Sequence, residues 1–340
     1  MELKVKIKKR LGNFFLDAEF ETDRPLALLG ASGSGKSVTL KCIAGIEKPD
    51  EGYIILNGRT LFDSEKKIDL SPQKRNVGYL FQNYALFPNM TVRKNIEAGA
   101  GRQRKKADTL INDFYLEDVK DKYPWEISGG QQQRTALARI IASEPEILLL
   151  DEPLSAIDGY MRWQLELTLS DIIRNFGGMY LMVTHDMGEA YRNCGRICTI
   201  DNGKTQGTSE REDFINSPSS VGAARISGCK NIFAFERTEN DGEIFVPELN
   251  INLSISGNLD GRSHIAFRDS AVDFDCRENK MECMIERVID DAFSTIIMLR
   301  PLNGKDALLR AEIKKDRAAC FCAGKKVTVG VRAEDIMPLE

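Results

Sequence analysis

Histidine and long apolar runs are both scarce in this sequence. Only 2 of the 340 residues are histidine, and no apolar stretch approaches the ~20 residues that a membrane-spanning helix needs. Residues 1–6 alternate charged and apolar side chains and lack the apolar centre of a signal peptide. We therefore expect a cytosolic chain that acts on any membrane through partner proteins.

Basic excess and paired cysteines, the marks of nucleic-acid binders and zinc proteins, are missing too. The formal net charge is -4, which argues against a dedicated nucleic-acid binder. Among the 8 cysteines, Cys194 and Cys198 are separated by three residues, and Cys320 and Cys322 by one. Neither spacing is the repeated C-x-x-C of a zinc site. We expect most of these cysteines to be reduced and packed.

Apolar segments of strand length alternate with helix-like segments along the first two thirds of the chain. This alternation predicts an α/β fold with a mainly parallel sheet and helices on its faces. The expected strands are 3–7, 26–29, 53–56, 77–81, 147–150 and 179–183, and a helix is expected over 36–44.

The length and the change in composition predict two domains. We place the first at residues 1–230 and the second at 231–340, where short β-rich segments are broken by Gly, Asn and Asp. A polar, helix-prone insertion at about 89–130 is expected to form a helical subdomain. Residues 264–269 resemble residues 329–334, which suits a small β-barrel built from two related halves.

Residues 30–37 match the phosphate-loop pattern G-x-x-x-x-G-K-[ST]. Glycines let the backbone turn successive N–H groups toward a phosphate, and the following helix adds its positive N-terminal end. Lys36 would reach the β- and γ-phosphates and Ser37 would bind Mg²⁺. The alternative is a plain glycine-rich turn, although a chance match is on the order of one in a hundred. The expected nucleotide-binding residues of this loop are Gly30, Ser32, Gly33, Ser34, Gly35, Lys36 and Ser37.

Asp151 and Glu152 end an apolar strand, at the carboxyl edge of the sheet beside the phosphate loop. Asp151 is expected to hold Mg²⁺ and Glu152 to polarise the attacking water, because phosphoryl transfer depends mainly on positioning and charge stabilisation. Taken alone, the two carboxylates could equally be N-terminal charges of a following helix. Their place beside the phosphate loop favours the catalytic interpretation.

A Ser-Gly-Gly-Gln loop lies one short helix upstream of that strand. The pairing resembles the ATP-binding cassette (ABC) family, in which two cassettes clamp ATP between them and act on a partner. The resemblance implies that the γ-phosphate held by one subunit is bound by this loop of the other, so a complete site needs a homodimer. The loop residues are Ser128, Gly129, Gly130 and Gln131.

Three more segments resemble motifs of the same family. Gln82 corresponds to the glutamine that contacts Mg²⁺ and reports the nucleotide state to the partner. His185 corresponds to the switch histidine that touches the γ-phosphate, whereas His264 is interpreted as structural or surface. Asp158 corresponds to the loop that crosses the dimer interface, where Ile157 replaces the usual leucine.

One family feature is missing. Many importer ATPases carry an aromatic residue, shortly after the first strand, that stacks on adenine. That position holds Leu11 here, with Phe14 and Phe15 just beyond. Either a phenylalanine takes its place or adenine is held weakly.

A single cassette without a membrane span resembles an importer subunit, and the extra β domain resembles the class that includes maltose, sulfate, iron and molybdate importers. Residues 61–64, residues 11–13 and the stretch 282–339 look most like the molybdate/tungstate ATPase. Sulfate is the nearest competitor, and iron, sugar or polyamine remain alternatives. The C-terminal domain (OB-like, of the TOBE/MOP kind) either binds molybdate or serves only as a dimerisation platform.

The resemblance implies ATP and Mg²⁺ as cofactors, integral-membrane permease subunits and a separate periplasmic or lipid-anchored binding protein as partners. It places the chain on the cytoplasmic face of the cell membrane. Tyr84 and Phe87, near Gln82, either receive a permease helix or are core aromatics.

Two other classes remain. One is a non-transport ABC ATPase acting on ribosomes or DNA, although such proteins usually join two cassettes or carry long coiled coils. The other is a regulatory binding protein with a degenerate ATPase, against which the intact Lys36, Glu152 and His185 argue.

Overall fold

The computed structural model describes residues 1–101, 104–154, 159–240, 242–305 and 307–340. The chain separates into two compact units, Met1–Arg211 and Glu212–Glu340. This division falls earlier than the boundary after residue 230 that composition suggested. The reason is that α9 (Val221–Ile226) packs against strands of the second unit, and Ala224 joins a buried cluster there.

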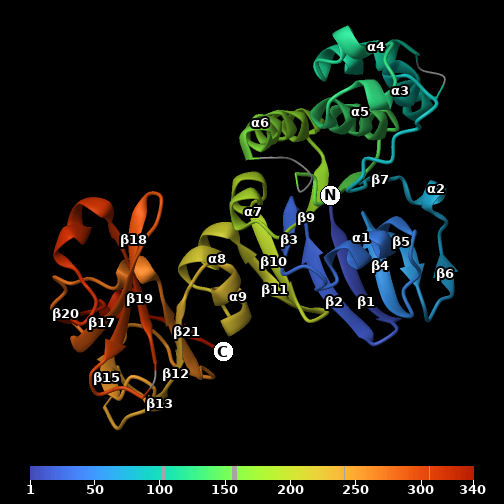
Figure 1. Ribbon diagram of the computed structural model, residues 1–340. Coiled ribbons are helices and arrows are strands. Elements are labelled where there is room, and N and C mark those ends of the chain that lie inside the picture. Colours follow the sequence, from blue (N-terminus) through green and yellow to red (C-terminus); the bar gives the residue numbers. More distant parts are fainter. Residues whose placement is uncertain (102–103, 155–158, 241, 306) are drawn as a thin grey trace. The chain divides into compact units, whose positions relative to one another are not determined.

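The first unit is built on an 11-stranded mixed sheet (Figure 1). Its order is β6-β5-β4-β1-β2-β11-β10-β3-β9-β8-β7. The strand bounds, in that order, are Ile68–Asp69, Arg59–Asp63, Glu51–Leu56, Leu3–Leu11, Phe14–Thr22, Lys204–Glu210, Arg196–Asp201, Leu26–Leu29, Met179–Thr184, Ile147–Asp151 and Val77–Leu80.

The expectation of a mainly parallel sheet is correct only for the part from β10 to β7, where neighbouring strands run parallel. From β6 to β2 neighbouring strands are antiparallel: short connections join β1 to β2, β4 to β5 and β5 to β6, and β4 also pairs antiparallel with β1. The hairpin between β4 and β5 turns at Asn57 and Gly58, which have φ 51° and 77°. Two successive left-handed residues match the twist of a two-residue hairpin, as this dipeptide predicts.

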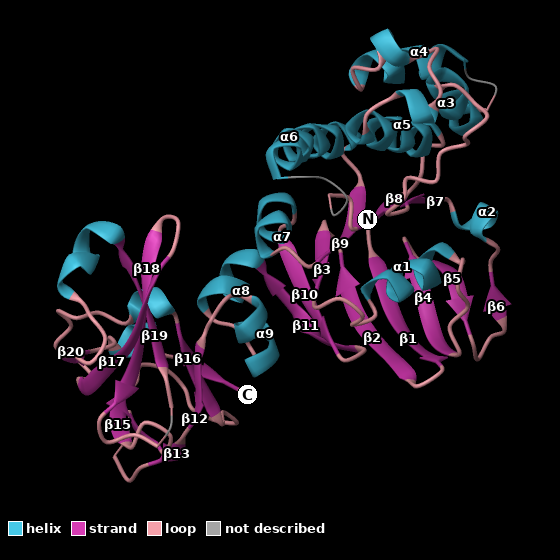
Figure 2. Cartoon of the chain, in the orientation of Figure 1, coloured by secondary structure: helices cyan, strands magenta, loops and turns pink. Residues whose placement is uncertain are grey.

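The helix expected over 36–44 forms as α1 (Lys36–Ala44), whereas the helical segment expected at about 89–130 contains α3 and α4 and is followed by α5, which begins at Gly129. Helix α3 packs on both α4 and α5 (Figure 2). The Thr91 hydroxyl starts α3 by accepting a hydrogen bond from the N–H of Lys94. No helix within the described residues is long and apolar enough to cross a membrane. The α-helices of the first unit, with α8 at its junction with the second, are α1 (Lys36–Ala44), α2 (Pro72–Arg75), α3 (Val92–Ala100), α4 (Arg104–Asp113), α5 (Gly129–Ala142), α6 (Gly159–Phe176), α7 (Met187–Asn193) and α8 (Arg211–Asn216).

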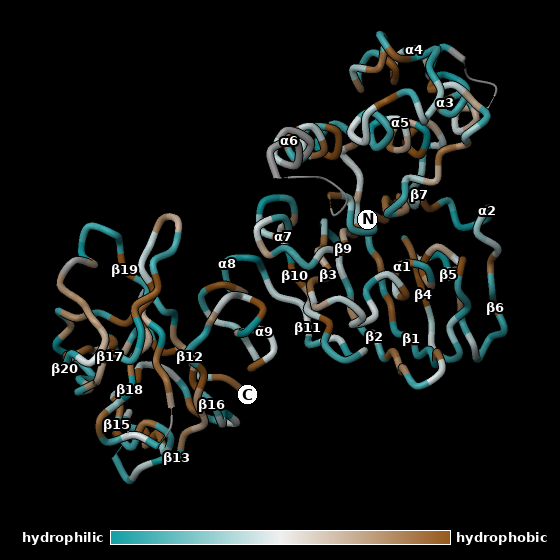
Figure 3. Tube along the Cα trace, in the orientation of Figure 1, coloured by the Kyte–Doolittle hydropathy of each residue, from teal (hydrophilic) through white to brown (hydrophobic). Residues whose placement is uncertain are grey.

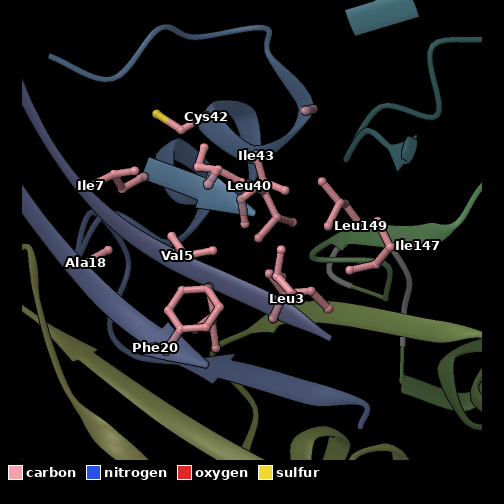
Figure 4. Close-up of a cluster of buried hydrophobic side chains, with 14 of the residues drawn as sticks. Leu3, Val5, Ile7, Ala18, Phe20, Leu40, Cys42, Ile43, Ile147 and Leu149 are labelled. Atoms are coloured by element: carbon pink, nitrogen blue, oxygen red, sulfur yellow. The ribbon is translucent and has the colours of Figure 1, made fainter. Parts of the chain in front are cut away.

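One core supports the start of α1. Leu3, Val5 and Ile7 of β1 are buried and face Leu40 and Ile43 of α1 (Figure 4). Each fully buried side chain of this size contributes roughly 1.5–3 kcal/mol. The alternate lysines of β1 lie on the solvated face, as their period-2 spacing predicts. This packing fixes the helix whose first turn forms part of the candidate site.

From residue 231 onward the second unit is β-rich and OB-like, with three small antiparallel sheets around a main buried core. Along β18 buried and half-buried residues alternate, and the hydropathy of the trace is drawn in Figure 3. The sequence echo corresponds to a structural one, because Arg268 and Arg332 each precede a 3₁₀ turn. The strands are β12 (Asn231–Ala234), β16 (His264–Phe267), β21 (Met337–Leu339); β13 (Glu236–Arg237), β14 (Glu243–Val246), β15 (Ile251–Ser254); β19 (Leu309–Lys314), β18 (Ser294–Pro301), β17 (Met281–Asp290) and β20 (Lys326–Val329).

Candidate nucleotide-binding site

The phosphate loop runs from the end of β3 to the first residue of α1, and two of its positions require glycine. A Cβ at Gly30 would lie 2.2 Å from the carbonyl oxygen of Ile200. Gly35 is the N-cap of α1 with φ 108°, a left-handed conformation that side chains disfavour. The strand, loop and helix therefore form the context that a phosphate loop needs.

The Lys36 ammonium is held inside this loop. It is 4% exposed and donates hydrogen bonds to the carbonyl oxygens of Gly30 and Ala31, both at 2.8 Å. Burial lowers the pKa of Lys36, and the nearby Glu152 and Asp151 oppose that shift. The cation is thus positioned at the loop while its charge has two acidic neighbours.

Two further features of the loop fit an anionic ligand. The Ser34 hydroxyl oxygen is buried and has no hydrogen-bond partner among the described residues, which a bound phosphate oxygen would supply. Ser32 and Gly33 are exposed at the rim, where backbone N–H groups of such loops meet phosphates.

The Asp151 carboxylate, 6% exposed, is the buried acidic centre of the site. Its Oδ1 accepts a hydrogen bond from the Ser37 hydroxyl at 2.7 Å, and its Oδ2 accepts one from the Tyr79 hydroxyl at 2.7 Å. Carboxylate and hydroxyl oxygens are donors that suit Mg²⁺. Gln82 is exposed in the loop after β7, the strand next to the one that ends in Asp151. Ser37 and Asp151 are therefore brought together, as expected for a metal site.

Glu152 and His185 follow neighbouring parallel strands, β8 and β9, and their side chains meet. His185 Nδ1 lies 3.6 Å from Glu152 Oε1. The backbone of Glu152 is left-handed, with φ 46°, and its N–H donates to the carbonyl of Val183 at 3.0 Å. A non-glycine residue in this conformation costs of order 1 kcal/mol or more, and such residues occur in turns and cluster at active sites and ligand clamps. The sequence placed both residues correctly at the strand ends.

The Ser-Gly-Gly-Gln segment forms the start of α5. The Ser128 hydroxyl accepts from the N–H of Gln131 at 3.4 Å, and the Gln131 side chain accepts from the N–H of Ser128 at 2.9 Å. This reciprocal pair is a capping box. Gly129 is exposed and Gly130 is buried, so the helix N-terminus is open on one side and suited to an anion. Asp158 lies outside the described residues, so its role stays a prediction.

The Phe14 ring packs beside Gly35 of the phosphate loop. A Cβ at Gly35 would lie 3.0 Å from Cζ of Phe14, and the Phe14 ring packs against the buried core. Leu11 and Phe15 are 39% and 50% exposed. An adenine contact by Phe14 or Phe15 stays a prediction. The Phe14 ring also has a packing role beside Gly35.

The two aromatics near Gln82 have different environments. Tyr84 is only 7% exposed, so the core interpretation applies to it. Phe87 is 44% exposed and borders a surface hollow of about 300 Å³. Arg139 stacks over the Phe87 ring at 5.0 Å and donates to the carbonyl of Ala85 at 2.8 Å. Sequence reasoning missed Arg139 and Tyr79, because only their long-range contacts reveal a role.

Comparisons with known proteins agree with this geometry. A family model described as "ABC transporter" matches residues 16–155. The spermidine/putrescine import ATP-binding protein PotA of Nitratidesulfovibrio vulgaris is 37% identical, covering 67% of this chain and 62% of that protein. The molybdenum import ATP-binding protein ModC of Paramagnetospirillum magneticum is 35% identical, with 64% and 61% covered. The matches thus span less than two thirds of these two relatives.

A longer match and a solved structure complete the comparison. The sulfate/thiosulfate import ATP-binding protein CysA 1 of Rhizobium meliloti is 34% identical over 85% of each chain. A dimeric structure of a post-hydrolysis state of the ATP-binding cassette MJ0796, bound to ADP and Pi, covers 62% of this chain and 99% of that one. Its TM-score is 0.52 and its identity 26%.

Proposed function

The chain belongs to the ABC transporter family of ATP-hydrolysing import subunits, and from this premise we propose that it energises the uptake of a small solute through a membrane permease. The observation that carries the proposal is the arrangement at the ends of β8 and β9. Asp151 is hydrogen-bonded to Ser37 of the phosphate loop, and Glu152 lies 3.6 Å from His185. This arrangement suits Mg²⁺-dependent attack of water on ATP.

The working form proposed is a homodimer at the cytoplasmic face of the membrane. The exposed start of α5 at Ser128 and Gly129 would bind the γ-phosphate held by the other copy, with Asp158 crossing the interface. The dimeric form of the matched cassette structure supports this assembly. Integral-membrane permease subunits and a solute-binding protein would complete the importer.

We place the permease contact at the hollow beside Phe87, which Ala98, Gly99 and Arg139 also line. Phe87→Ala is expected to remove most of the permease-dependent stimulation of ATP hydrolysis while sparing basal hydrolysis, because Phe87 is exposed and belongs neither to the phosphate loop nor to the ends of β8 and β9. Hydrolysis with and without the permease is the measurement. Phe293→Ala, which alters a 94% exposed phenylalanine in the second unit, is the control. Equal loss of basal and stimulated activity in the Phe87 variant would contradict the docking site.

For the solute we propose molybdate or tungstate. The support is the likeness of residues 61–64, 11–13 and 282–339 to molybdate/tungstate ATPases, together with the molybdenum import relative. Sulfate is the second candidate, favoured by the sulfate/thiosulfate relative whose match extends over 85% of each chain. Spermidine is the third candidate, because one relative is a spermidine/putrescine import ATP-binding protein.

Reconstitution with the neighbouring permease and binding protein tests the solute. Molybdate or tungstate is expected to stimulate ATP hydrolysis, and sulfate and spermidine are expected to have no effect. Stimulation by sulfate or spermidine alone would leave the ATPase mechanism intact and overturn the proposed solute.

Calorimetry of the full chain with molybdate tests whether the C-terminal unit also senses the anion. Absence of molybdate binding at millimolar concentration would leave the C-terminal unit as a dimerisation platform.

A further inference from the structure

The register of β7 on β8 places Tyr79 on the same face of the sheet as Asp151. Tyr79 is paired with Leu149 in the parallel ladder, and Asp151 follows Leu149 by two residues. Side chains two apart on a strand share a face. Tyr79 is 9% exposed, and its ring packs at 4.5 Å, between centroids, from the ring of Phe81. The tyrosine is therefore a core residue whose hydroxyl points at the acidic centre of the site.

The hydroxyl, rather than the ring, makes the specific contact. A phenylalanine would fill the core equally well at this position. Burying the additional hydroxyl is unfavourable unless it is hydrogen-bonded. The Tyr79 hydroxyl donates to Asp151 Oδ2 at 2.7 Å, while the Ser37 hydroxyl donates to Oδ1 at 2.7 Å. The two donors lie on opposite oxygens, so together they fix the rotation of the carboxylate about its own axis.

We propose that Tyr79 is a positioning residue for the Mg²⁺ site, orienting Asp151 through Oδ2 so that Oδ1 faces Ser37. The proposal rests on the Mg²⁺-dependent ATP chemistry proposed above. Tyr79 also lies three residues before Gln82, on the strand that leads into the Gln82 loop. The hydroxyl thus ties the metal-binding carboxylate directly to that strand.

Partners that orient a metal ligand commonly change metal affinity by about 10- to 100-fold when removed. Tyr79→Phe keeps the ring and its packing and deletes only the donor. We expect the Mg²⁺ concentration for half-maximal hydrolysis to rise about tenfold, with little change in kcat at saturating Mg²⁺. A purely structural tyrosine would leave the Mg²⁺ dependence unchanged.

Binding of Mn²⁺, a spectroscopic substitute for Mg²⁺, provides a readout that does not depend on turnover. Electron paramagnetic resonance of the full chain with a non-hydrolysable ATP analogue should show about tenfold weaker Mn²⁺ binding in Tyr79→Phe. Nucleotide affinity without metal should be the same as in the wild type. Tyr180→Phe is the matched control, because it removes another buried tyrosine hydroxyl, bonded to the carbonyl of Asn193.

The outcomes separate the inference from the proposed function. Equal Mn²⁺ affinity in wild type and Tyr79→Phe would overturn the positioning role while the ATPase function stands. Equal loss in Tyr79→Phe and Tyr180→Phe would also overturn it, because it would indicate a general packing effect. A wild-type chain that binds neither nucleotide nor metal would refute the proposed function itself. Unfolding temperatures of both variants check that the fold is kept.

Discussion

Replacing Glu152 by glutamine is expected to slow ATP hydrolysis by about 10²- to 10⁴-fold, the usual contribution of a positioned general base. The amide is nearly the same size as the carboxylate, but it cannot accept a proton from the attacking water. The backbone at Glu152 is held by its hydrogen bond to the Val183 carbonyl, so the side chain should keep its place near His185. ATP binding should therefore survive the change.

Single-turnover hydrolysis and nucleotide binding, measured on the same preparation, check this result. A dimer that persists in the presence of ATP is expected for Glu152→Gln, because the step that would release it is blocked. Glu51→Gln is the matched control, since it removes the same charge from an exposed glutamate paired with Lys8 at 3.7 Å. Turnover of Glu152→Gln within a few-fold of wild type would assign the base to another residue.

Arg75→Ala is expected to destabilise the first unit by about 3–5 kcal/mol. Arg75 is 0% exposed, and its guanidinium donates to the carbonyl oxygens of Leu70, Cys42 and Ile43 at 2.7, 2.7 and 2.9 Å. The last two carbonyls belong to the C-terminal turn of α1. Alanine would remove the guanidinium donors from the Leu70 and Ile43 carbonyls and would leave the Cys42 carbonyl with only the 3.2 Å hydrogen bond from the Gly45 N–H. It would also leave a cavity beside the helix that starts at Lys36.

Chemical denaturation, followed by fluorescence and by calorimetry so that the two units can be told apart, measures this effect. Lys48→Ala is the control, because Lys48 lies 3.4 Å from Asp69, the carboxylate that also pairs with Arg75. The Lys48 side chain is 70% exposed, so its loss should cost less than about 1 kcal/mol. A similarly small loss of unfolding free energy in both variants would show that water replaces Arg75 as the hydrogen-bond donor to these carbonyls.

The amino-acid sequence was sufficient for the local features of this protein. The glycine pattern of residues 30–37 predicts a strand, loop and helix, because the left-handed backbone at Gly33 and Gly35 and the close contact at Gly30 disfavour any side chain. Apolar runs that lead into Asp151 and His185 predict the carboxyl edge of a sheet, because strands buried on both faces are near-continuous apolar runs and end close to where ionisable residues begin. The Asn57-Gly58 turn and the alternation along β1 follow from equally local rules.

Tertiary structure decided what depends on contacts distant in sequence. Periodicity does not show that half of the sheet is antiparallel or that α9 belongs with the second unit, because strand order and helix packing depend on long-range partners. Tyr84 and Phe87 look alike in sequence, yet one is buried and the other exposed. The hydrogen bond from Tyr79 to Asp151 spans 72 positions and exists only because β7 pairs with β8 in one register. A shift of one residue would turn Tyr79 to the opposite face of the sheet.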